Sequence, residues 1–228
     1  MPNVLNLRPW FRRLGVGVWS GWPERVYQED RYQQRLSAVR AHLGECLGIA
    51  ESGPISIVSM CAGDGRDVMD VVSSHERRAD VNAWMVELDR NSVTTGERRA
   101  AAAGLSSRVR FLNADATAFR TYQGIGPADV VLVCGVWGHV PSMDRAPLVQ
   151  ALARLCKSGG TVIWTRGVSQ DLVRYQEILS HFDSSSWQKL RFSLTPDKTW
   201  AVATHRYCGP PQELPIGGQI FNFRRSAS

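Results

Sequence analysis

The sequence predicts an α/β fold: a doubly wound, Rossmann-like sheet that is mostly parallel and ends in a C-terminal antiparallel hairpin. Three observations predict it. Strand-like and helical segments alternate from residue 55 to residue 182, which is typical of a parallel sheet with helices on both faces. The expected strand 128–135 contains an unbroken apolar run, as strands buried on both faces do. Two strand-like segments, 189–195 and 199–207, are joined by a turn of three residues.

The first part of the chain has a different character. Residues 1–22 show no hydrophobic period, and we interpret them as an irregular arm or lid. Pro23 suits the first turn of a helix, and residues 24–47 carry apolar side chains at helical spacing. We therefore expect an N-terminal arm and helix over residues 1–52, followed by the α/β part over residues 53–228 within a single overall domain.

The alternating elements then follow in order, and their strands share one functional edge. Right-handed crossovers place the carboxyl ends of all parallel strands on the same side, where ligands bind in folds of this kind. Glycine or proline punctuates most of the boundaries, as at the expected helix end before Gly104. The expected strands are 55–60, 81–88, 109–113, 128–135 and 161–165, and the expected helices are 66–74, 92–103, 147–156 and 171–182.

The end of the chain departs from the alternation. Residues 189–195 and 199–207 are strand-like and predict the antiparallel hairpin. The tail is rich in proline and glycine, and residues 220–223 are again strand-like.

Composition narrows the class of protein. The 228 residues include five cysteines without a Cys-x-x-Cys pair, which indicates neither a zinc site nor a disulfide framework. The net charge is +6, but no dense basic block with interleaved aromatic residues accompanies it, so a nucleic-acid partner is disfavoured. No signal peptide and no apolar run of roughly 20 residues stands out, and we expect a cytoplasmic protein without a membrane partner. A homodimer remains open.

A glycine loop follows the first expected strand. Residues 61–67 read Cys-Ala-Gly-Asp-Gly-Arg-Asp, and the position that a dinucleotide-binding loop gives to its third glycine is Val68. Asp64 and Asp67 would repel a pyrophosphate at a helix N-terminus, which disfavours a nicotinamide-dependent dehydrogenase. The two carboxylates instead suit a cationic ligand without phosphate.

Two further acids stand at the ends of the next two strands. Glu87 lies about 20 residues beyond the loop, where an acid can accept hydrogen bonds from both hydroxyls of a ribose. Asp115 follows the third strand, where it can accept from an exocyclic adenine amine or cap the next turn. Three such signals in order are harder to obtain by chance than any one of them.

These motifs resemble those of the class I S-adenosylmethionine-dependent methyltransferases, over residues 58–165. Residues 60–67 look like the glycine-rich first motif, in a variant similar to that of small bacterial small-molecule O-methyltransferases, and residues 131–136 look like the strand that borders the methyl group. The first motif often begins with an acid, but Met60 or Cys61 stands there in this chain. Asp64 and Asp67 are the expected substitutes for contact with the cofactor's amino group.

The resemblance implies S-adenosyl-L-methionine as cofactor and a set of residues that bind it. They are Cys61, Ala62, Gly63, Asp64, Gly65, Asp67, Glu87, Leu88, Asp115, Ala116, Cys134 and Gly135.

The methyl acceptor has to be inferred from the loop after the fourth strand. Residues 135–141 lack the Asp/Asn-Pro-Pro-aromatic pattern of nucleic-acid amino methyltransferases. His139 stands where a general base would take the proton of a hydroxyl acceptor, and His205 is the second candidate for this base. The other histidines, His42, His75 and His181, are interpreted as surface residues.

Aromatic residues near this loop suggest a ring-shaped substrate. Trp137 could stack on a planar or sugar ring, with Trp22 and Tyr27 closing over it. We expect O-methylation of a small hydroxylated molecule, with a sugar or glycoside slightly favoured. A magnesium ion held in part by Asp144 is an open alternative to metal-free catalysis. The other open alternatives are N-methylation of a small amine or RNA, and a non-catalytic member of the fold.

Overall fold

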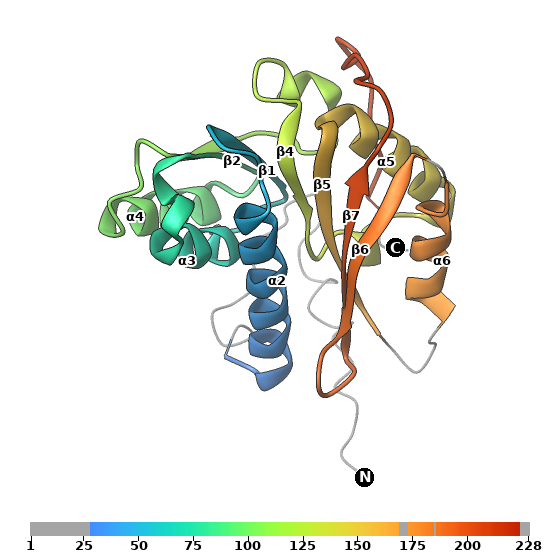
Figure 1. Ribbon diagram of the computed structural model, residues 1–228, viewed down its shortest axis with the longest axis horizontal. Coiled ribbons are helices and arrows are strands. Elements are labelled where there is room, and N and C mark those ends of the chain that lie inside the picture. Colours follow the sequence, from blue (N-terminus) through green and yellow to red (C-terminus); the bar gives the residue numbers. More distant parts are fainter. Residues whose placement is uncertain (1–27, 169–172, 185, 224–228) are drawn as a thin grey trace.

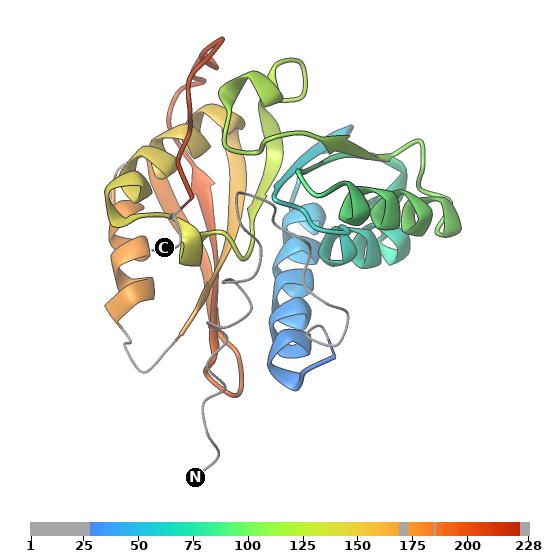
Figure 2. The same cartoon turned by 180° about the vertical axis from the view of Figure 1, so that it is seen from behind.

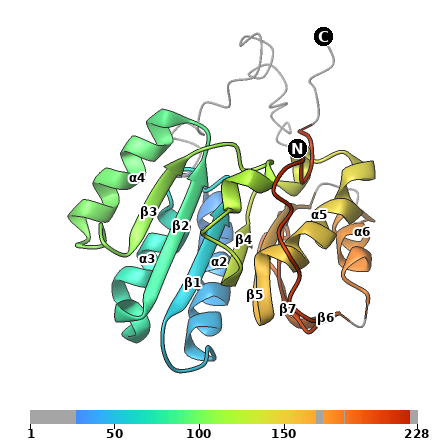
Figure 3. The ribbon, with the colours of Figure 1, turned by 90° about the horizontal axis from the view of Figure 1, so that it is seen from above.

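The computed structural model describes residues 28–168, 173–184 and 186–223. It contains one seven-stranded sheet in the order β3-β2-β1-β4-β5-β7-β6, which Figure 3 shows from above. The first five strands are parallel, and β7 runs antiparallel to both β5 and β6. The strands are β1 (Ile55–Met60), β2 (Val81–Glu87), β3 (Val109–Asn113), β4 (Ala128–Val133), β5 (Cys156–Gly167), β6 (Trp187–Leu194) and β7 (Trp200–Tyr207). The predicted fold class is confirmed.

Helices cover both faces of the sheet (Figures 1 and 2). One apolar cluster joins the sheet to α2, α3 and α4, and the other joins it to α5 and α6. Burial of these two clusters stabilises the fold, because removing apolar surface from water contributes about 25 cal/mol per Å². The helices are α2 (Asp30–Gly48), α3 (Arg66–Ser74), α4 (Arg90–Ala102), α5 (Ser142–Leu155) and α6 (Val173–His181), with short 3₁₀ turns η2 (Glu76–Ala79), η3 (Phe119–Tyr122) and η4 (Trp137–His139).

Several element boundaries differ from the predictions. Helix α5 starts at Ser142 rather than at the predicted 147, so Pro147 lies inside the helix instead of at its first position. Residues 220–223 form no strand, although Gln219 makes one isolated antiparallel bridge to Ala118. Ile220 and its neighbour are apolar because they pack into the core beside α5, which an alternating sequence pattern does not distinguish from a strand.

His42 is a buried residue of α2 and not the predicted surface residue. Its Nδ1 lies 2.8 Å from Thr204 Oγ1 on β7, and its Nε2 lies 2.9 Å from Ser193 Oγ on β6. The imidazole therefore ties α2 to the hairpin, and burial together with the Arg191 charge lowers its pKa to about 4. On the opposite face of β7, burial and Lys189 lower the pKa of His205 to about 4 as well.

These two histidines predict an acid-sensitive fold. Their pKa is about 4 in the folded chain but ordinarily 6.5, so the unfolded chain binds more protons between these values. The free energy of unfolding is therefore expected to fall as pH is lowered from about 6.5 to about 4. Urea denaturation at a series of pH values measures it. His42→Gln, which keeps side-chain hydrogen bonding but does not titrate, should reduce this slope, and an unchanged slope would exclude His42 as a cause.

Candidate functional site

The predicted glycine loop lies at the carboxyl edge of the sheet, in a strained and tightly held conformation. Cys61 has a φ of 51°, and Gly63 and Gly65 have φ values of 56° and 70°. A Cβ at Gly65 would lie 2.8 Å from Phe111 Cζ, so both space and backbone conformation require glycine there. The Ala62 N–H donates to the Val86 carbonyl at 2.9 Å, which holds the loop against the end of β2.

Glu87 ends β2 directly beside this loop. Its Oε2 accepts a hydrogen bond from the Gly63 N–H at 2.8 Å, and its Oε1 accepts one from the Asp89 N–H at 2.9 Å. The residue is 9% exposed. A carboxylate with its oxygens held at a strand end can accept additional hydrogen bonds from a diol, which is the role predicted for it. Leu88, the next residue, is 52% exposed and leaves an apolar surface at the same edge.

Asp64 was expected to offer its negative charge to a ligand, but arginine side chains neutralise this charge. Its two carboxylate oxygens accept hydrogen bonds from Arg66 Nε and Nη2 at 2.9 and 2.6 Å, and Arg99 Nε lies 3.3 Å away. Burial acts to raise the pKa of Asp64, but the two guanidinium groups outweigh it and hold this pKa below its usual value. Local sequence could not indicate Arg99 as a partner because it belongs to α4, 35 positions further along the chain, whereas Arg66 stands only two positions from Asp64.

Asp67 is the acid of the loop that has no arginine in direct contact among the described residues. It is 7% exposed at the first turn of α3, and its Oδ1 accepts a hydrogen bond from the Val68 N–H at 3.1 Å. Burial raises the pKa of Asp67, and the Arg35 charge partly opposes this rise. A buried carboxylate of this kind is stabilised by a cationic ligand.

Asp115 and the end of β4 lie at the same edge. Asp115 Oδ1 accepts hydrogen bonds from Thr117 N and Oγ1 at 2.8 and 2.7 Å, so it stabilises its own turn, as the capping alternative anticipated. Gly135 has a φ of 80°, and its N–H donates to Thr165 Oγ1 at 2.9 Å. Burial, with the Asp67 carboxylate, raises the pKa of Cys134, which keeps this neighbouring thiol protonated and unsuited to nucleophilic attack.

Two of the predicted substrate residues turn out to be core residues. Trp137 is 0% exposed, and its ring packs edge-on against Trp164 and Phe182 with centroid distances of 6.2 and 6.4 Å. His205 is 2% exposed, stacks on Phe182 at 4.3 Å, and accepts a hydrogen bond from Trp164 Nε1 at 3.2 Å. Neither ring faces the edge of the sheet, so the predictions that Trp137 stacks on a substrate and that His205 serves as a base are wrong.

His139 remains at the predicted place. It ends the η4 turn after β4, it is partly exposed, and its backbone N–H donates to the Val136 carbonyl at 2.9 Å. The short turn therefore holds one buried side chain, Trp137, and one partly exposed side chain, His139. The other predicted substrate contacts, Trp22 and Tyr27, and the arm or lid 1–22 lie outside the described residues.

Asp144 is a structural residue rather than a metal ligand. Its Oδ2 accepts hydrogen bonds from Asn222 N at 2.8 Å and from Asn222 Nδ2 at 3.4 Å, which fastens the C-terminal tail to α5. Across residues 28–168, 173–184 and 186–223, no three acidic, histidine or cysteine side chains gather as a metal site. The described residues therefore do not fit the magnesium site considered from the sequence.

The chain was compared with known protein families and solved structures. Residues 57–160 match a family model described as a methyltransferase domain. The matched residues make up a little under half of the chain, and they are similar to a methyltransferase domain. No curated protein matches its sequence.

Solved structures share the fold of this chain at low sequence identity. Magnesium protoporphyrin IX methyltransferase from Synechocystis, with bound S-adenosylmethionine, is 14% identical, with a TM-score of 0.60 over 90% of this chain and 92% of that one. A methyltransferase from Thiobacillus denitrificans, in complex with S-adenosylhomocysteine, is 14% identical, with a TM-score of 0.58 over 82% and 100%. An RNA methyltransferase from Salinibacter ruber, in complex with the same product, is 19% identical, with a TM-score of 0.50 over 78% and 94%.

Three further residues, Arg35, Trp200 and Arg166, lie at this edge and were not predicted from the sequence. Arg35 on α2 places its guanidinium 5.3 Å from the ring centroid of Trp200, at the start of β7. Arg166, near the end of β5, has Nη1 2.7 Å from the position of a Cβ on Gly138. None of the three belongs to a local motif, because pairing of β5 with β7 and packing of α2 bring them together. Nothing in the spacing of apolar residues along the sequence indicates that these three residues lie together.

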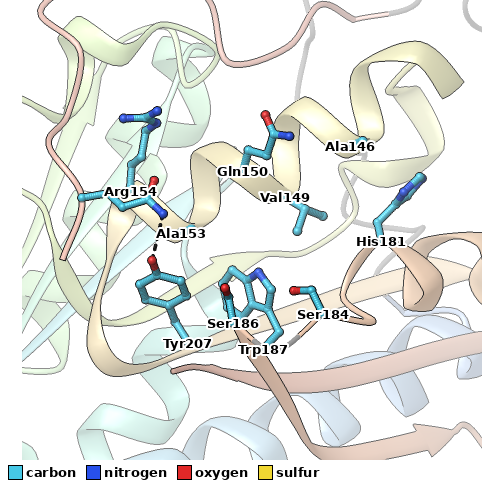
Figure 4. Close-up of a pocket in the computed structure, with 11 residues that line it drawn as sticks. Ala146, Val149, Gln150, Ala153, Arg154, His181, Ser184, Ser186, Trp187 and Tyr207 are labelled. Atoms are coloured by element: carbon cyan, nitrogen blue, oxygen red, sulfur yellow. Dashed lines mark hydrogen bonds between the residues drawn. The ribbon is translucent and has the colours of Figure 1, made fainter. Parts of the chain in front are cut away.

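A cavity of about 380 Å³ lies elsewhere, between α5 and the hairpin (Figure 4). Val149 and Gln150 of α5 line one side, and Trp187 and Tyr207 line the other. Tyr207 ends β7, whereas Trp200 at the carboxyl edge begins it, so the cavity belongs to the other end of this strand. None of the predicted cofactor residues lines it. Of the helices that the structure describes, none is long and apolar enough to cross a membrane.

Proposed function

We propose that this protein is a methyltransferase that transfers a methyl group from S-adenosylmethionine to a hydroxyl of a small molecule, with a sugar or glycoside slightly favoured. One observation carries the choice of donor: Glu87, at the end of β2, accepts a hydrogen bond from the Gly63 N–H of a positive-φ loop whose one basic side chain, Arg66, is paired with Asp64. The Glu87 carboxylate can accept hydrogen bonds from a ribose, and the backbone turn beside it lets a ligand approach closely. The neighbouring structures that contain this donor or its product support the same choice.

The acceptor side follows from the loop after β4. Methyl transfer forms an oxygen–carbon bond as the sulfur–carbon bond breaks, and S-adenosylhomocysteine leaves as a neutral thioether. The hydroxyl must lose a proton, and His139 is the partly exposed base next to the end of β4. The main task of the remaining residues is to align the oxygen with the methyl group. Since Trp137 is buried, the partly exposed Trp200 replaces it as the aromatic surface for a ring.

The choice between acceptor atoms is tested by a substrate panel. Purified protein and S-adenosylmethionine are incubated with glycosides, phenols, small amines or RNA, and release of S-adenosylhomocysteine is measured. We expect turnover with hydroxylated small molecules. When the methyl group of the donor is labelled, the label should appear in a methyl ether of the acceptor. Turnover confined to amines or RNA would replace O-methylation by N-methylation, and donor binding without turnover across the panel would favour a non-catalytic role.

A further inference from the structure

The C-terminal tail returns from the end of β7 toward the carboxyl edge and contacts the loop that follows β3 (Figure 2). The Phe119 N–H donates to the Gly218 carbonyl at 3.1 Å. The Ile220 N–H donates to the Thr117 carbonyl at 2.7 Å, and the Ile220 side chain is 3% exposed in the core. The tail is therefore fastened to the residues directly after Asp115, the acid expected on the adenine side of the donor site.

A side-chain contact continues from the tail to Asp115. Thr117 Oγ1 lies 2.7 Å from Asp115 Oδ1 and 2.8 Å from Gln219 Oε1. A hydroxyl has one proton, so it can donate to only one of these oxygens at a time. The charged carboxylate is the stronger acceptor, and the Gln219 amide, rotated by half a turn, donates its own N–H to Thr117. The three side chains then form a chain of hydrogen bonds that runs from Gln219 through Thr117 to Asp115.

One carboxylate oxygen of Asp115 is left for a ligand. Its Oδ1 accepts hydrogen bonds from the Thr117 N–H at 2.8 Å and from the Thr117 hydroxyl, whereas no residue within the described ranges donates to Oδ2. Burial, together with the Glu87 and Asp115 carboxylates, raises the pKa of Cys61. Both acids therefore lie close to the start of the glycine loop, and Oδ2 is the part of Asp115 that can accept from a ligand held there.

We propose that Gln219 is a positioning residue of the donor site: through Thr117 it holds Oδ1 of Asp115, so that Oδ2 accepts a hydrogen bond from the 6-amino group of adenine. The inference rests on the proposed use of S-adenosylmethionine. Gln219 acts through Thr117 and does not itself contact the base. Because two hydrogen bonds to one oxygen restrict rotation of a carboxylate, the tail contributes to the preference for a base that carries this amine.

A second glutamine distinguishes positioning from simple attachment of the tail. Gln123 Nε2 donates to the Pro215 carbonyl at 2.9 Å, and its side chain is exposed, as is that of Gln219. Gln123 therefore secures the tail without forming a hydrogen bond to Thr117. If these contacts only attach the tail, the two glutamines should behave alike on replacement, whereas the proposed role requires an effect for Gln219 alone.

Gln219→Met tests the positioning role, because methionine has a similar length without an amide. Isothermal titration compares S-adenosylhomocysteine with its 6-deamino analogue, in which the base is unsubstituted purine. The unaltered protein should bind S-adenosylhomocysteine about 10- to 100-fold more tightly, since the analogue cannot donate to the charged acceptor. We expect Gln219→Met to weaken S-adenosylhomocysteine about 3- to 10-fold and to leave the analogue within about twofold. Gln123→Met is the matched control and should preserve both affinities.

A double-mutant cycle locates the effect of Gln219 on Asp115. Asp115→Asn should remove most of the preference for S-adenosylhomocysteine over the analogue, and adding Gln219→Met should cause no further loss of preference. Equal weakening of both ligands in Gln219→Met, or an unchanged preference, would overturn the inference and leave the proposed function intact. Failure of the unaltered protein to bind S-adenosylhomocysteine would overturn both.

Discussion

Replacement of Glu87 by alanine is expected to reduce affinity for S-adenosylhomocysteine about 100-fold or more. The carboxylate would accept hydrogen bonds from two ribose hydroxyls, and each hydrogen bond to a charged group contributes about 1.5–3 kcal/mol. The change also removes the acceptor of the Gly63 N–H, which loosens the loop that surrounds the ligand. Isothermal titration with S-adenosylhomocysteine measures the loss without any need for an acceptor.

Two variants make the Glu87 result specific. Glu87→Gln keeps one oxygen acceptor and should give an intermediate affinity. Glu97→Gln changes an exposed acid on α4 and should bind as the unaltered protein does. If Glu87→Ala bound S-adenosylhomocysteine as tightly as the unaltered protein, the ligand would not rest on the end of β2.

Replacement of His139 by alanine is expected to cut turnover about 100-fold or more with a hydroxyl acceptor, while the affinity for S-adenosylmethionine stays nearly intact. The imidazole would remove the hydroxyl proton, a contribution typically worth 10² to 10⁴ in rate. It would not contact the adenosine, which the glycine loop and Glu87 hold. The measurement is the initial rate of S-adenosylhomocysteine release under saturating donor, together with a binding titration.

The comparison residue for this experiment is His181, at the end of α6 and away from the carboxyl edge. His181→Ala should keep turnover within about twofold. An unchanged rate in His139→Ala would remove this histidine from the mechanism. A matched loss of turnover and of donor affinity would instead indicate that His139 supports the loop.

The residues that the sequence located well are those at the ends of parallel strands. Register places Met60 opposite Val86 and Glu87 opposite Asn113, so loops that follow these strands converge by the geometry of the sheet. An acid at the end of β2 is therefore near the glycine loop in any fold of this topology. The hydrogen bond that Glu87 accepts from the Gly63 N–H shows this proximity directly.

The sequence could not predict the direction of side chains within loops and central strands. Strand β7 lies between β5 and β6 with helices on both faces, so Thr204 and His205 are both buried although they point to opposite sides. A polar residue in the final hairpin could equally have been exposed if β7 were an edge strand. Trp137 was misjudged for a similar reason, because one 3₁₀ turn directs it inward.

Charge balance was the other quantity that local sequence could not supply. Asp64 and Asp67 look equivalent in the chain, yet Asp64 is held by Arg66 and Arg99, whereas Asp67 has no arginine in direct contact among the described residues. Long-range packing of α2 and α4 decides which acid is available to a ligand. Asp67 is therefore the carboxylate of the glycine loop that is available to a cationic ligand.

A crystal structure of the complex with S-adenosylhomocysteine tests the central claim most directly. The expected complex has the ribose hydroxyls on the Glu87 carboxylate, the amino-acid end beside Asp67, and the sulfur beside the Gly135 turn. Ligand bound instead in the cavity between α5 and the hairpin, or elsewhere than at the carboxyl edge of the sheet, would contradict the account.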